Sequence, residues 1–75
     1  HLTALEDRIL RHLVSNRGVV CTKEDIIRSV WGDEFTSEGT LTVHVRRLRA
    51  RIEKEPDSPA CIRTVWGRGY LFEAS

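Results

Sequence analysis

Residues 38–54 read EGTLTVHVRRLRARIEK and decide the fold, because they combine an apolar stripe with four arginines. At about 100° per residue, four of the apolar side chains fall within one narrow arc of a helix. They are Leu41, Val45, Leu48 and Ile52. The pattern predicts a helix from Glu38 to about Lys54, ended by the proline-containing segment 55–59.

The opposite face of this predicted helix is small and basic. Gly39, Val43, Arg46 and Ala50 lie at its centre, with Arg47 beside it. Small side chains let a DNA groove approach the helix backbone, and arginines reach phosphates or guanine edges. A charged run can also be a solvated surface without a partner, but residues 39–52 contain no acid for pairing along the helix. The stretch is therefore predicted to enter the major groove of duplex DNA.

Two shorter helices are predicted upstream. Thr3 and Glu6 have the spacing of a capping box, and the apolar periodicity that follows stops at residues 16–18. After a short extended run at 19–21, Thr22 can cap a second helix, which Gly32 ends. Residues 33–37 then form a loop that leads into the long helix.

Downstream, residues 61–72 predict a β-hairpin whose tip carries two glycines around Arg68. In that position Arg68 would meet a phosphate or a minor groove, as the wing of a DNA-binding domain does. Alternatively, the glycines only satisfy a tight turn, with Trp66 and Tyr70 as core aromatics. The predicted fold class is mainly α with a C-terminal β-hairpin, a winged helix-turn-helix of three helices plus a wing, and residues 1–75 form one domain.

The formal net charge is only +1, but the charges are unevenly distributed. Residues 1–35 hold five basic and six acidic side chains, whereas 39–52 and 60–72 hold six arginines and no acid. No apolar run is long enough to cross a bilayer and no signal peptide is recognisable, so a cytoplasmic protein is expected. Cys21 and Cys61 lack metal-ligand spacing and are expected to be reduced, with a disulfide or a redox role as the alternative.

Catalysis is not expected from this sequence. The histidines, His1, His12 and His44, lie in no recognisable nucleophile, metal or phosphate-loop motif. We therefore expect no enzyme activity, no cofactor and no metal site. The main alternative to DNA binding is a winged helix that presents its third helix to another protein.

Three ordered motifs resemble the C-terminal DNA-binding effector domain of OmpR/PhoB-type response regulators. They are VWG at 30–32, LTVHVRRLRARI at 41–52 and IRTVWGRGY at 62–70. The resemblance implies a bacterial two-component transcription regulator that binds promoter direct repeats as a head-to-tail dimer. In that family a receiver domain, phosphorylated through a sensor kinase, controls dimerisation. Neither the receiver nor the four-stranded sheet that usually precedes the first helix is expected within residues 1–75.

The resemblance also assigns roles to individual residues. Those expected to contact bases are Thr40, Val43 and Arg47. Those expected to contact the DNA backbone are Trp31, Thr42, His44, Arg46, Arg49 and Arg51. On the helical wheel, however, His44, Arg49 and Arg51 lie nearer the buried edge of the helix.

Two further segments receive roles in the same way. The wing contacts are assigned to Arg63, Thr64 and Arg68, because Trp66 stands where a wing arginine is frequent in the family. The loop that touches RNA polymerase in activators of the family corresponds to Asp33, Glu34, Phe35, Thr36 and Ser37. A plain connector is the alternative for this loop.

Overall fold

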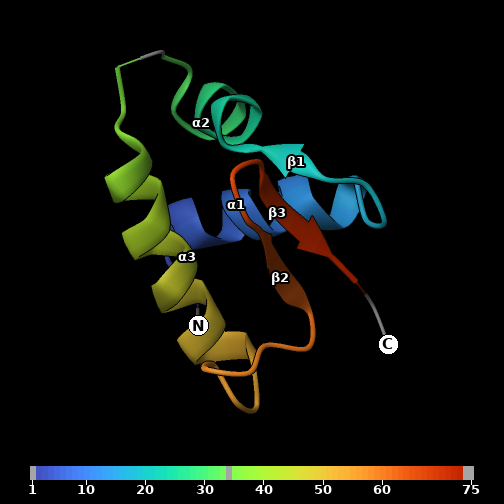
Figure 1. The fold of residues 1–75 in the computed structure, drawn as a ribbon. Coiled ribbons are helices and arrows are strands. Elements are labelled where there is room, and N and C mark those ends of the chain that lie inside the picture. The colour runs from blue at the N-terminus through green and yellow to red at the C-terminus, as the bar shows by residue number, and fades with distance from the viewer. Residues whose placement is uncertain (1, 34, 74–75) are drawn as a thin grey trace.

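The computed structural model describes residues 2–33 and 35–73. Along the chain they form α1 (Ala4–Ser15), β1 (Cys21–Thr22), α2 (Lys23–Trp31), α3 (Glu38–Ile52), β2 (Ile62–Val65) and β3 (Gly69–Phe72). Figure 1 shows the β2–β3 hairpin lying alongside α3, with α1 behind both. The predicted winged-helix arrangement is confirmed. Among the described helices, none has the length and apolar character that crossing a membrane requires.

The predicted start signals of the first two helices are confirmed. The hydroxyl of Thr3 accepts a hydrogen bond from the Glu6 backbone N–H at 3.2 Å, and the Glu6 carboxylate accepts one from the Thr3 N–H at 3.2 Å. At α2, Thr22 accepts from the Asp25 N–H at 3.1 Å. Gly32 then ends α2 in the left-handed region at φ 76°, where glycine meets no steric cost.

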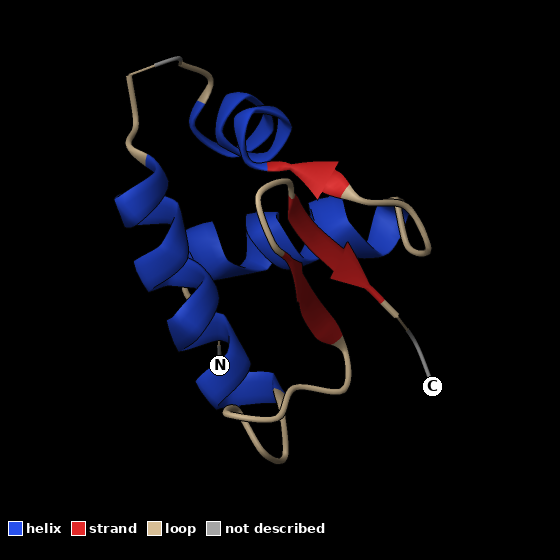
Figure 2. Cartoon of the chain, in the orientation of Figure 1, coloured by secondary structure: helices blue, strands red, loops and turns tan. Residues whose placement is uncertain are grey.

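The sheet contains one strand more than the predicted hairpin. β1 pairs with β3 in antiparallel register, which places Cys21 opposite Tyr70 and gives the strand order β1-β3-β2. Figure 2 shows these strands side by side next to the helices. The two glycines near the hairpin tip have different functions. Gly67 adopts φ 78° in the turn, whereas a Cβ on Gly69 would collide with the backbone carbonyl of Cys21.

The apolar stripe of α3 packs into the core, as predicted. Leu41, Val45 and Leu48 are buried, and Ile52 is half-buried against them. The prediction for Tyr70 as a core aromatic is also confirmed, but the same prediction for Trp66 is wrong because its side chain is 88% exposed. Both cysteines are free thiols in the structure: Cys21 is buried, and Cys61 is half-buried.

The long helix, predicted to run to about Lys54, ends two residues earlier. α3 ends at Ile52 because Glu53 adopts an extended conformation, with φ −88° and ψ 138°. This turn directs the Glu53 carboxylate toward the segment before β2. There it accepts hydrogen bonds from the backbone N–H groups of Ala60, Cys61 and Ile62, at 2.8 to 3.2 Å. These hydrogen bonds join the end of α3 to the segment that leads into β2.

Candidate nucleic-acid interface

The exposed face of α3 is the one that the helical pattern predicts. Thr40, Arg46 and Arg47 are exposed, and Val43 is 42% exposed. Ser37 caps the helix by accepting a hydrogen bond from the Thr40 N–H at 3.1 Å. The first turn of α3 therefore places Thr40 in one row with Val43 and Arg47. These three side chains offer a hydroxyl, an apolar group and a guanidinium, three of the group types that read base edges in a major groove.

Trp31 and His44 meet beside this face. Their ring centroids lie 5.4 Å apart at 79°, an edge-to-face arrangement. The Nδ1 of His44 lies 2.8 Å from the carbonyl oxygen of Thr40. A carbonyl only accepts, so Nδ1 carries the proton of this bond and the ring is held in one orientation. The structure thus brings together two of the residues predicted to contact the DNA backbone.

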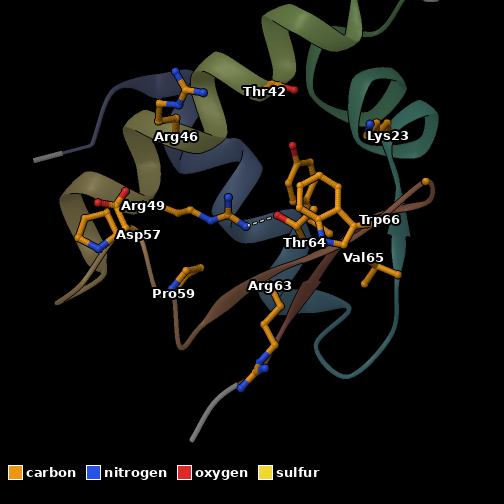
Figure 3. Close-up of a pocket in the computed structure, with 13 residues that line it drawn as sticks. Lys23, Thr42, Arg46, Arg49, Asp57, Pro59, Arg63, Thr64, Val65 and Trp66 are labelled. Carbon is orange, nitrogen blue, oxygen red and sulfur yellow. Dashed lines mark hydrogen bonds between the residues drawn. The ribbon is translucent and has the colours of Figure 1, made fainter.

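A groove of about 620 Å³ separates α3 from the β2–β3 hairpin. Figure 3 looks into it, with Thr42 and Arg46 on the α3 side and Arg63, Thr64 and Trp66 on the hairpin side. Arg46 and Arg49 bring positive charge to the α3 wall, whereas the Arg63 side chain extends from β2 away from α3 (Figure 3), and one acid, Asp57, also lines the groove. The arrangement suits a single polyanionic strand between helix and hairpin.

Ion pairs hold the cations Lys23 and Arg63 beside this groove. Lys23 pairs with Glu38 at 3.4 Å, and Arg63 pairs with Glu73 at 3.1 Å with both side chains about half-exposed. Exposed ion pairs of this kind contribute little to stability. Either cation can therefore exchange its carboxylate partner for a DNA phosphate at little cost in stability.

Arg49 contacts the interior of the domain. Its Nε and Nη2 donate to the carbonyl oxygen of Ile62 at 3.1 and 2.9 Å, and Nη2 also donates to the Thr64 hydroxyl at 2.8 Å. The guanidinium carbon lies 5.5 Å from the centroid of the Tyr70 ring. Burial lowers the pKa of this guanidinium below its ordinary value.

Arg49 in the last turn of α3 and Glu53 just after the helix thus bind the C=O and the N–H of the same residue, Ile62. This pair braces α3 against the hairpin. The brace was missed from the sequence, where the only signal was the position of Arg49 near the buried edge of the helical wheel.

Arg51 lies apart from the other predicted backbone contacts. Its Nε is 2.8 Å from the carboxylate of Glu6, whose side chain is only 2% exposed. This ion pair ties the last turn of α3 to the first turn of α1. Arg51 therefore makes a contact between helices, and its DNA contact stays a prediction.

The tip of the hairpin presents an arginine and a tryptophan. The Arg68 N–H donates to the Val65 carbonyl at 3.0 Å and closes the turn, and its own carbonyl accepts from the Lys23 N–H at 3.4 Å. This second bond fastens the tip to the start of α2. The side chains of Arg68 and Trp66 are exposed.

Comparison with known proteins decides the family. The family model described as "Transcriptional regulatory protein, C terminal" matches residues 1–72. The chain belongs to this family. It is 45% identical over 74 residues to the regulatory protein VanR of Enterococcus faecium, covering 96% of the chain and 32% of VanR. The chain spans about a third of the length of the curated relatives it matches.

Solved structures agree with this assignment. The response regulator DrrB of Thermotoga maritima, an OmpR/PhoB homolog, matches with a TM-score of 0.90 and 36% identity, over 99% of this chain and 34% of DrrB. The DNA-binding domain of Klebsiella pneumoniae RstA, solved in complex with the RstA box, matches with a TM-score of 0.84 and 25% identity, over 96% and 72%. The resemblance to OmpR/PhoB-type regulators is confirmed.

In this member of the family, the loop between α2 and α3 displays an aromatic side chain. The Asp33 carboxylate accepts hydrogen bonds from the Phe35 N–H at 3.0 Å and from the Thr36 N–H and hydroxyl at 2.8 and 2.9 Å. The bonds from Thr36 and Phe35 lower the pKa of Asp33 below its ordinary value. Phe35 is 93% exposed, and Glu34 lies outside the described residues.

Proposed function

We propose that this chain binds duplex DNA in a sequence-specific manner, as the effector domain of a two-component transcription regulator. α3 would enter the major groove, and the hairpin would contact the adjacent backbone or minor groove. The observation that carries the proposal is the exposed, acid-free row of Thr40, Val43 and Arg47, next to a groove that Lys23 and Arg46 line. The DNA complex of the related RstA domain supports it.

Within this proposal the exposed residues divide into two groups. Thr40, Val43 and Arg47 contact base edges, which alone carry the sequence information of the major groove. Arg46, His44 and Thr42 contact phosphates, with Trp31 supporting the His44 ring.

Three other arginines act around this helix. Arg68 contacts the DNA backbone or minor groove from the hairpin tip. Arg49, through the Thr64 hydroxyl and the Ile62 carbonyl, and Arg51, through Glu6, hold α3 in position.

The regulator's wider organisation forms part of the proposal. Two copies bind direct repeats head to tail, and a receiver domain phosphorylated through a sensor kinase controls this pairing in the cytoplasm. Membership of the family and the match to about a third of each curated relative support this organisation.

Salt dependence tests DNA binding and separates it from the protein-binding alternative. We expect the logarithm of affinity for a mixed-sequence duplex to fall linearly with the logarithm of salt, by about 0.9 for each phosphate contacted. Fluorescence anisotropy titrations between about 50 and 200 mM salt measure the slope. Arg11→Ala, which removes an exposed cation of α1 paired with Asp7, is the control and should keep the slope. Absence of duplex binding at the lowest salt, or a flat response, would favour the protein-binding winged helix.

For the loop, we propose a contact with RNA polymerase, based on the exposure of Phe35 above the turn held by Asp33. We expect Phe35→Ala to change the free energy of unfolding by less than about 0.5 kcal/mol, because the side chain is not packed. DNA affinity should also be kept, while transcription in a purified system with the regulator and bacterial RNA polymerase decreases. Val19→Ala, which removes an exposed apolar side chain outside the loop, should leave transcription unchanged. Equal transcription by wild type and Phe35→Ala would make the loop a plain connector.

A further inference from the structure

The indole of Trp66 is large, apolar and 88% exposed at the tip of the hairpin. The bond from the Arg68 N–H to the Val65 carbonyl and the positive φ of Gly67 define a tight turn. Trp66 occupies the second position of this turn, where its side chain is not required for the core. An exposed aromatic side chain on a small domain is a typical anchor for a partner.

Trp66 lines the groove between the hairpin and α3, opposite Arg46 (Figure 3). The groove combines two kinds of surface. Lys23 and Arg46 supply positive charge and the indole of Trp66 supplies apolar area, whereas the side chains of Arg63 and Val65 leave β2 on the side away from α3. A DNA strand has the complementary pattern, because each anionic phosphate is followed by a deoxyribose with a carbon-rich face. The apolar part of the groove therefore fits the sugar, and the cations fit the phosphates.

We propose that Trp66 packs its indole against deoxyribose in the DNA strand that lies in this groove. The inference rests on the proposed function and adds an apolar contact to a wing whose other contacts are ionic. Burial of an apolar ring releases no counterions, so this part of the affinity does not depend on salt. It is also independent of sequence, since every nucleotide carries the same sugar.

Salt titrations of two neighbouring variants test this proposal. Trp66→Ala should weaken binding to a mixed-sequence duplex by about tenfold at every salt concentration and keep the wild-type slope. Arg68→Ala, the matched variant from the same turn, should lower the slope by about 0.9. Trp66→Phe keeps an aromatic ring and should lose less affinity than Trp66→Ala. Thermal unfolding of all three variants should match wild type, because both side chains are exposed.

Tryptophan fluorescence supplies a readout that does not depend on affinity. With saturating duplex, wild type should show protection of an exposed tryptophan from acrylamide quenching, and Trp66→Phe should lose this protection. Wild-type affinity in Trp66→Ala, a lowered salt slope in that variant, or unprotected Trp66 in the complex would each overturn the inference and leave the proposed function intact. Failure of wild type itself to bind duplex would overturn both.

Discussion

Glu53→Gln is expected to lower the free energy of unfolding by about 2 to 4 kcal/mol, because charged hydrogen bonds contribute about 1.5 to 3 kcal/mol each. The wild-type carboxylate is buried, and both of its oxygens accept from backbone N–H groups of Ala60, Cys61 and Ile62. Glutamine keeps one acceptor but turns an NH₂ group toward these donors. Urea unfolding measures the loss. Glu55→Gln, an exposed neighbour, should change stability by less than about 0.5 kcal/mol.

The pH dependence of the stability difference between wild type and Glu53→Gln is a second control. Burial raises the pKa of the Glu53 carboxyl, but the hydrogen bonds from Ile62, Cys61 and Ala60 outweigh it and hold the pKa below its ordinary value. The folded chain therefore binds this proton less tightly than the unfolded chain. The contribution of the Glu53 carboxylate to the free energy of unfolding is complete above the unfolded pKa of about 4.3 and is lost as the pH falls through the folded pKa. The stability gap between wild type and Glu53→Gln should narrow below this range. Equal stability of the two proteins at neutral pH would contradict the role assigned to Glu53.

Arg47→Ala is expected to cost about 1 to 3 kcal/mol in binding to a duplex selected from a random pool by the wild-type chain. It should also relax the preference at one base position. Arg47 lies on the exposed face of α3 in the row with Val43 and Thr40, where a guanidinium reaches base edges. Arg46→Ala is the matched variant, because Arg46 lines the groove next to the hairpin. It should weaken binding to all sequences alike. Affinities for the selected and a scrambled duplex measure the difference. Equal losses on both duplexes for both variants would contradict this division.

Much of the fold could be predicted because its signals are local. Thr3, Thr22 and Gly32 mark helix ends through bonds to residues within four positions, and the stripe of Leu41, Val45 and Leu48 repeats with the period of one helix. β1 was not predicted as a strand of the sheet. It has two residues, too few to show a strand period, and it forms only by pairing with β3.

The candidate site was predicted less completely, for a related reason. A helical wheel identifies the exposed face of α3 but does not show what packs beside it. Arg49 and Arg51 therefore had the same predicted role as Arg46, whereas the structure pairs them with Ile62 and Glu6. Glu53 carried no recognisable signal at all. Its partners are backbone N–H groups seven to nine residues away, which any sequence supplies.

Methylation protection on a duplex selected from a random pool tests the central claim, that α3 reads DNA from the major groove, most directly. Dimethyl sulfate attacks guanine N7, which lies in the major groove, and adenine N3, which lies in the minor groove. We predict that the bound wild-type chain protects guanine N7 positions within the site. In the Arg47→Ala complex, protection should be lost at one position of the site, while Arg46→Ala at saturation should keep the wild-type pattern. A saturated wild-type complex that protects no guanine N7 would contradict the account.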